Sequence, residues 1–76
     1  MELEPNARMG GVPHFSGTKE YFHCVQGNIS VVVTGKSYEL KPGDVIAFPG
    51  DSAHAYINLS STKALGFSVV VMAPHL

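Results

Sequence analysis

Two histidines and a glutamate in this sequence are residue types that bind divalent metal ions. His14 stands six residues before Glu20, and His54 lies in the separate segment GDVIAFPGDSAHAYIN. Two imidazoles and one carboxylate form the facial ligand set that suits Fe(II) and similar ions, and zinc accepts three such donors with a fourth position open. The sequence therefore raises the hypothesis that His14, Glu20 and His54 bind one metal ion.

The segments that carry these residues are typical of β-strands. Runs rich in Val, Ile and aromatic residues alternate with Gly- and Pro-containing turns, and no stretch keeps the apolar period of a helix. Turn signals about 8–12 residues apart indicate an all-β sandwich or barrel. The 76 residues allow one domain, 1–76, with an N-terminal strand or loop over 1–13. We expect the other strands over 20–25, 29–34, 37–40, 45–48, 53–58 and 64–72.

Glu20 is expected to point toward the interior of this β-structure. Successive side chains of a strand point to opposite faces, so Glu20 shares a face with Phe22 and Cys24 while His23 points away. A carboxylate on an apolar face is costly unless it is paired, hydrogen-bonded or bound to a metal. Glu20 therefore requires partners from other strands, whereas Cys24 is interpreted as a small hydrophobic residue.

The same alternation groups the side chains of two later strands. In 53–58 one face carries His54, Tyr56 and Asn58. In 64–72 one face carries Leu65, Phe67, Val69 and Val71. Because Tyr56 and Asn58 share the face of His54, they are candidates for contacts around a metal ion or with a bound ligand.

The two segments resemble the two motifs of the cupin family. The first motif runs Gly, five residues, His-x-His, three or four residues, Glu, six residues, Gly; its positions here are His14, Ser16 in place of the second His, Glu20 and Gly27. The second runs Gly, five residues, Pro-x-Gly, two residues, His, three residues, Asn; its positions here are Gly43, Pro49, His54 and Asn58. Arg8 and Asp51 stand where the family has glycine.

This resemblance implies a jelly-roll barrel or sandwich with a metal pocket between its strands. The implied metal ligands are His14, Glu20 and His54, and the implied ion is Zn, Fe, Mn or Ni. Ser16 is a poor ligand for such a cation. We expect it instead to hydrogen-bond a bound ligand or water, together with Tyr56 and Asn58.

A narrower resemblance links PHFSGTKEY to cupin domains that are fused behind a helix-turn-helix DNA-binding domain. In that group the cupin is the effector-sensing and dimerising half of a transcriptional regulator. The resemblance implies a small-molecule effector and a homodimer, and it implies that this chain lacks the DNA-binding half and the first cupin strands. The apolar segments 29–33 and 67–72 must be covered from solvent. This need also favours a homodimer, formed by sheet packing or by exchange of an N-terminal strand.

Composition argues against several other functions. Five basic residues against six acidic ones give a net charge of −1 without a basic cluster, so we expect no nucleic-acid contact by this chain itself. The sequence has no apolar run of the roughly 20 residues that span a membrane, and we do not expect the acidic segment MELEPNARMGG, which contains Pro and Gly, to act as a signal peptide. A single cysteine, Cys24, excludes an internal disulfide, and we expect a cytoplasmic protein.

Three functions remain open on this evidence. The leading hypothesis is a ligand- or metal-binding sensor domain of a transcriptional regulator, and the alternative is a small metal-dependent enzyme of the dioxygenase or isomerase kind. A structural dimerisation domain is the third. An enzyme requires a poised acid or base, and the candidates beyond the metal ligands are Tyr56, Tyr21, His23 and Cys24. We assign no catalytic residue, and we expect His75 to be exposed near the C-terminus.

Overall fold

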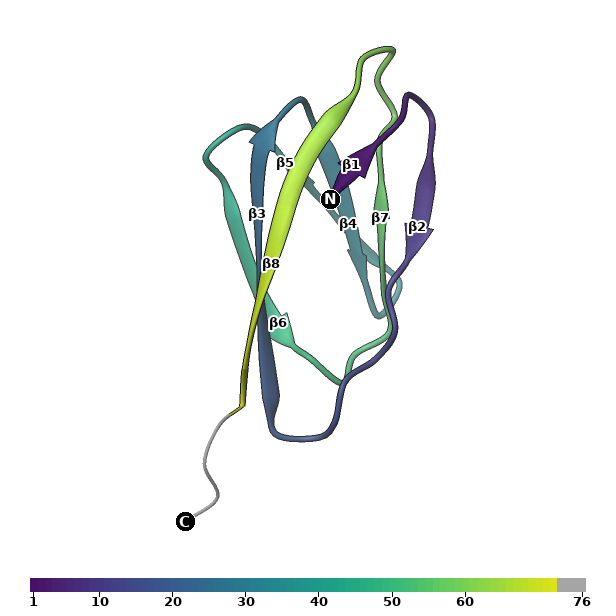
Figure 1. Cartoon of the computed structure of the whole chain (residues 1–76). Coiled ribbons are helices and arrows are strands. Elements are labelled where there is room, and N and C mark those ends of the chain that lie inside the picture. The colour runs from purple at the N-terminus through teal and green to yellow at the C-terminus, as the bar shows by residue number, and fades with distance from the viewer. Residues whose placement is uncertain (73–76) are drawn as a thin grey trace.

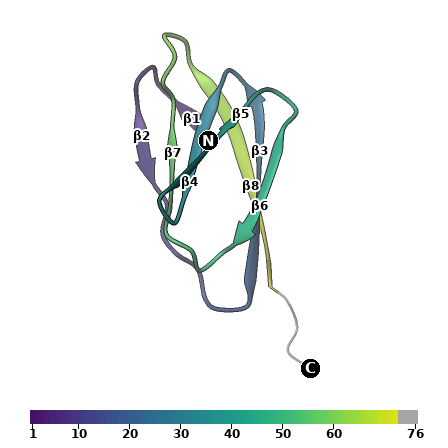
Figure 2. The same ribbon diagram turned by 180° about the vertical axis from the view of Figure 1, so that it is seen from behind.

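The computed structural model describes residues 1–72 as eight β-strands in two antiparallel four-stranded sheets (Figures 1 and 2). The first sheet has the order β1-β8-β3-β6, with β1 Glu2–Leu3, β8 Ala64–Met72, β3 Thr18–Gln26 and β6 Val45–Pro49. The second has the order β2-β7-β4-β5, with β2 Arg8–Gly10, β7 His54–Ile57, β4 Ile29–Val33 and β5 Lys36–Leu40. The prediction for His75 falls outside the described residues.

The predicted all-β fold is confirmed as a sandwich whose two sheets face each other (Figure 1). Within residues 1–72, no strand pairing joins the first sheet to the second, so the barrel is not closed. The segment 1–13 contributes the short strands β1 and β2, which pair with β8 and β7. The described chain contains no helix with the length and hydrophobicity that crossing a membrane requires.

Two turns between consecutive strands depend on glycines that tolerate positive φ. Gly27 connects β3 to β4 with a φ of 76°, and Gly35 connects β4 to β5 with a φ of 83°. A side chain at either position would strain the backbone. The turn at Gly35 sets the register of the β4–β5 hairpin, whereas the turn at Gly27 takes the chain from the first sheet to the second.

The core lies between the inner faces of the two sheets. Phe22 of β3, Ile29 and Val31 of β4 are fully buried, and the ring of Phe22 packs 4.5 Å from that of Tyr56 on β7. Glu20 and Cys24 share the inner face with Phe22, as the alternation predicted. The core therefore forms a packed floor, and Glu20 lies beside it on the same strand.

The strand β8 presents its larger side chains to the outside. Leu65, Phe67, Val69 and Val71 share one face, as expected, but this face points away from the core because Ala64 and Gly66 are the buried residues. Gly66 packs against Phe22, and a Cβ added at Gly66 would lie 2.5 Å from Phe22 Cζ. The inner face of β8 therefore carries small residues where the aromatic core approaches it.

Candidate metal and ligand site

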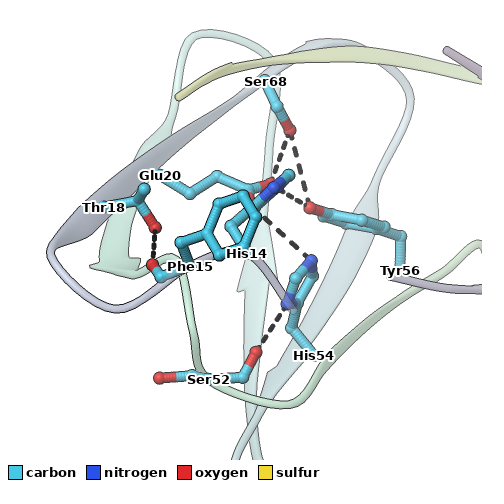
Figure 3. A network of polar contacts seen from close by, with 8 residues as sticks. All are labelled: His14, Phe15, Thr18, Glu20, Ser52, His54, Tyr56 and Ser68. Atoms are coloured by element: carbon cyan, nitrogen blue, oxygen red, sulfur yellow. Dashed lines mark hydrogen bonds and ion pairs between the residues drawn. The ribbon is translucent and has the colours of Figure 1, made fainter. Parts of the chain in front are cut away.

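Glu20 lies at the centre of a polar network between the two sheets (Figure 3). Its side chain is 3% exposed. Oε2 accepts hydrogen bonds from the hydroxyl of Tyr56 on β7 and, at 2.8 Å, from the hydroxyl of Ser68 on β8. Oε1 is buried without a hydrogen-bond partner among residues 1–72. One carboxylate oxygen is thus fixed by two donors, and the other remains available for a ligand.

Both predicted histidine ligands approach this available oxygen. Nε2 of His14 lies 3.4 Å from Glu20 Oε1, and Nε2 of His54 lies 3.6 Å from it. His54 projects from β7 with a side chain that is 2% exposed. His14 precedes β3 in the loop 11–17, and its side chain is 41% exposed. The structure therefore brings together the three residues proposed as metal ligands.

The donor set fits a divalent metal ion. A buried polar atom without a partner costs roughly 1–3 kcal/mol, and more when it is charged, so Glu20 Oε1 would gain from a cation. Ligand atoms bound tetrahedrally to zinc at about 2.0–2.2 Å lie about 3.3–3.6 Å from one another. The two distances to Oε1, 3.4 and 3.6 Å, match that separation. Neutral imidazole and carboxylate are also chemically suitable ligands.

The three side chains do not form a complete metal-binding cluster as they stand. Among residues 1–72, no group of three or more His, Cys, Asp or Glu residues is arranged so that it could hold a metal ion. The short distances are those to Glu20, and the exposed side chain of His14 can change rotamer. We expect metal binding to include a movement of His14, while Glu20 and His54 keep their buried positions.

Backbone groups hold His54 on two sides. Nδ1 lies 2.8 Å from the carbonyl oxygen of Ser52, so Nδ1 carries the ring proton and donates it (Figure 3). With its proton on Nδ1, an imidazole that binds a metal does so through the lone pair of Nε2, the His54 atom that lies 3.6 Å from Glu20 Oε1. On its other side lies Gly11, where an added Cβ would be 2.1 Å from Nε2 and 2.3 Å from Cδ2. Gly11 is therefore a positioning residue for His54.

Replacing Gly11 with alanine is expected to weaken metal binding by about tenfold or more. The methyl group would take space that the His54 ring occupies, and loss of a contact that orients a metal ligand costs about 10–100-fold in affinity. Gly10→Ala is the matched control, because no atom lies within 4 Å of a Cβ at Gly10. Calorimetric titration of both variants with Zn²⁺ measures the difference. Equal affinities of the two variants would contradict this role of Gly11.

The loop 11–17 is fixed through its backbone. The N–H of His14 donates to the carbonyl of Gly50 at 2.8 Å, and the hydroxyl of Thr18 donates to the carbonyl of Phe15 at 2.7 Å. Gly50 lies against Thr18, since a Cβ there would be 2.2 Å from Thr18 Oγ1. The loop thus holds the backbone of His14 in place while leaving its imidazole accessible to solvent.

Tyr56 orients the carboxylate of Glu20. Burial raises the pKa of the Tyr56 phenol well above its ordinary value, and the hydrogen bond to Glu20 raises it further. Tyr56 therefore stays protonated at neutral pH and continues to donate to Oε2. The ring of Tyr56 also packs against the ring of Phe22. This arrangement directs Oε1, rather than Oε2, toward the two histidines.

Ser16 and Asn58, which the sequence placed among the ligand-binding residues, lie apart from the network. Ser16 is exposed in the loop 11–17. Asn58 directly follows the last residue of β7 and is fully buried, as its alternation with His54 and Tyr56 predicts. Its partners are the carbonyls of Leu3, Glu4 and Thr62 and the backbone N–H and hydroxyl of Ser60. We interpret Asn58 as a residue that connects β1 to the loop after β7.

Ser68 and Gly11 belong to the site although the sequence analysis did not select them. Ser68 could have been found, because it is a polar residue within the apolar strand β8 and alternates away from Phe67 and Val69. Its register opposite Phe22 places it on the inner face beside Glu20. Gly11 had no such signal, since its role depends on a contact between distant segments.

One wall of the site is apolar and uncovered. Val70 stands opposite Glu20 in the register of β3 and β8, and Met72 stands opposite Thr18, so both share the inner face. They are nevertheless 42% and 68% exposed. The Glu20 site therefore borders a part of β8 where a ligand could contact apolar side chains.

Comparisons with known proteins agree with this fold. The family described as Cupin domain matches residues 1–71. The cupin domain of an XRE-family transcriptional regulator from Enterobacter cloacae is 30% identical with a TM-score of 0.85, over 97% of this chain and 77% of that one. An HTH_3-family transcriptional regulator from Vibrio cholerae is 28% identical with a TM-score of 0.80, over 97% of this chain and 40% of that one.

An enzyme is also among the similar structures. A cupin-superfamily sugar phosphate isomerase from Silicibacter pomeroyi is 25% identical with a TM-score of 0.74, over 96% of this chain and 48% of that one. No curated protein sequence matches the chain. The family match over residues 1–71 covers both sheets and every residue of the Glu20 network. This chain therefore belongs to the cupin family.

Proposed function

We propose that this chain is a ligand-sensing cupin module that binds a divalent metal ion through His14, Glu20 and His54. The observation that carries the proposal is the buried Oε1 of Glu20, which has no hydrogen-bond partner within residues 1–72 and lies within 3.6 Å of both Nε2 atoms. Zn, Fe, Mn and Ni all suit this donor set. The likeness to two transcriptional regulators supports sensing as the role.

When bound, the ion would supply a Lewis-acidic centre for a polar or anionic group of an effector. Tyr56 and Ser68 keep the Glu20 carboxylate in one orientation, and Ser52 keeps the proton of His54 on Nδ1. Val70 and Met72 offer an apolar surface next to this centre. We therefore propose a small effector with a polar head and an apolar part, which Ser16 at the exposed loop could also contact.

The enzyme alternative has less support from the geometry. Tyr56 is committed to Glu20, and its raised pKa makes it a poor acid or base at neutral pH. Burial raises the pKa of the Cys24 thiol, which disfavours a nucleophilic thiolate. His23 and Tyr21 alternate away from Glu20. We therefore assign no catalytic residue, although the likeness to a sugar phosphate isomerase keeps an isomerase as the second candidate.

The proposal includes the setting in which the module works. We propose a cytoplasmic homodimer that senses its effector and leaves DNA contact to another part of a regulator. The Vibrio cholerae regulator is longer than this chain, which spans 40% of it. The low and scattered basic charge of the chain fits a module without a nucleic-acid surface of its own.

Metal titration tests the proposal directly. Chain freed of metal with a chelator is titrated with Zn²⁺, Mn²⁺, Ni²⁺ and, without oxygen, Fe²⁺. We expect one equivalent to bind for at least one ion and to raise the melting temperature, because a ligand that binds only the folded state stabilises it. Absence of binding by every ion would overturn the metal site and favour a metal-free pocket or a structural domain.

A further inference from the structure

The two sheets separate along one side of the sandwich, between β5 and β6. Each is an outer strand of its sheet, no strand pairing joins them within residues 1–72, and they diverge from the turn 41–44 that connects them (Figure 2). A cavity of about 330 Å³ opens to solvent between them. This volume lies at the lower end of the roughly 300–1,000 Å³ that is typical of small-molecule sites. The cavity therefore has room for a small organic molecule.

The inner walls of this cavity, which we call the edge slot, are apolar. Val33 of β4 lines it from one sheet, and Ile46 and Phe48 of β6 line it from the other. Val33 and Phe48 are buried, and Ile46 packs against the core. Ile46 and Phe48 belong to the inner face because they stand opposite Phe22 and Glu20 in the register of β3 and β6. A ligand in the edge slot would therefore contact an apolar surface that is continuous with the core.

A lysine and a tyrosine of β5 complete the lining of the edge slot. Lys36 and Tyr38 share the inner face of the second sheet, since Lys36 stands opposite the buried Val33, and both line the slot. The Lys36 ammonium lies 5.8 Å from the centre of the Tyr38 ring, and it forms no ion pair with an acidic side chain among residues 1–72. The nearby Glu39 alternates to the outer face. A positive charge without an acidic partner thus stands beside an apolar cavity.

We propose that the edge slot binds a small organic anion, with an apolar ring or branched chain between Phe48 and Tyr38 and a carboxylate next to Lys36. The carboxylate would supply the ion-pair partner that the described chain does not provide for Lys36. Burial of the apolar part against Val33 and Phe48 would supply affinity from the hydrophobic effect. The charge of the slot selects against cations, and its apolar walls select against inorganic anions such as phosphate.

The edge slot is separate from the Glu20 network, although Phe48 belongs to the surroundings of both. The ring of Phe48 lines the slot, and its centroid lies 5.1 Å from that of the His54 ring. The proposed metal ligands His14, Glu20 and His54 do not line the slot. The inference therefore goes beyond the proposed function and does not rest on metal binding. A ligand that displaced the Phe48 ring would nevertheless act on His54.

Titration of the metal-free chain with phenylacetate, followed by ¹H–¹⁵N NMR spectra, tests the proposal. Metal is removed so that the carboxylate cannot bind an ion at the Glu20 site. We expect saturable shifts of the amide signals of 33–38 and 46–48, with a dissociation constant of about 1–10 mM for a probe of this size. Phenylacetamide, which has the same shape without the charge, should bind about threefold more weakly. Absence of saturable shifts, shifts centred on His14 and His54, or equal affinities of the two probes would overturn the proposal.

Two substitutions separate the contribution of the charge from that of the apolar wall. Lys36→Gln should weaken phenylacetate binding about threefold and leave phenylacetamide binding unchanged. Tyr38→Ala should weaken the binding of both probes at least about threefold, because both lose an apolar contact. Lys19→Gln is the matched control, since the Lys19 ammonium lies 5.9 Å from the Tyr21 ring in the same Lys-x-Tyr arrangement but outside the edge slot, and it should change neither affinity. Phenylacetate binding that Lys36→Gln leaves unchanged, or that Lys19→Gln weakens as much, would contradict the proposed anion site.

Discussion

Glu20→Gln is expected to lower metal affinity by at least about a hundredfold while leaving the chain folded. The glutamine can still accept hydrogen bonds from Tyr56 and Ser68 through its oxygen, so the packing of β3 is kept. It then turns a neutral amide nitrogen, which has no lone pair for a metal, toward His14 and His54. Direct loss of a ligand should exceed the 10–100-fold cost of disturbing an outer partner.

The matched control is Glu39→Gln, which makes the same chemical change at an exposed residue of β5. Calorimetric titration with the ion that binds most tightly compares both variants with the unmodified chain, and urea denaturation of the metal-free proteins confirms that each is folded. If the metal affinity of Glu20→Gln stays within threefold of that of the unmodified chain, the ion binds elsewhere. The cupin fold would stand in that case, but the metal site would not.

The inward position of Glu20 could be predicted because strand periodicity and the cost of burying a carboxylate both identified it. Alternation with Phe22 and Cys24 placed its carboxylate on an apolar face, and the cost of burying a charge demanded partners. The same alternation within β7 placed His54 and Tyr56 on one side, and both side chains reach Glu20. Strand periodicity thus sufficed for Glu20, His54 and Tyr56.

Alternation did not identify the partners of a buried residue at the end of a strand, and it left the inward direction open where both faces were apolar. Asn58 directly follows β7 and is buried like His54 and Tyr56, but its amide donates to the backbone carbonyls of Leu3, Glu4 and Thr62. In β8, apolar residues on both faces left the inward direction undetermined, and the larger residues point outward. Small Gly66 faces the core because Phe22 fills the space there. Such packing depends on distant residues and is not encoded in local periodicity.

Asn58→Ala is expected to reduce the free energy of unfolding by about 2–4 kcal/mol, a large part of the stability of a domain of this size. The side chain donates to the carbonyl of Leu3 at 3.1 Å and to that of Thr62 at 2.7 Å, and it accepts from the Ser60 hydroxyl at 2.7 Å. Alanine leaves these groups without their partner and removes the connection between β1 and the loop after β7. Urea denaturation of the metal-free chain measures the change.

Two further variants separate this structural role of Asn58 from ligand binding. Ser60→Ala removes one of the partners of Asn58 Oδ1 and should cost less than about 1.5 kcal/mol. Asn58→Asp keeps an acceptor for Ser60 but loses the donors to Leu3 and Thr62, so it should be destabilised nearly as much as the alanine variant. Because Asn58 lies apart from Glu20, the folded fraction of each variant should bind metal and effector with unchanged affinity. Unaltered stability with a tenfold weaker affinity would instead return Asn58 to the binding site.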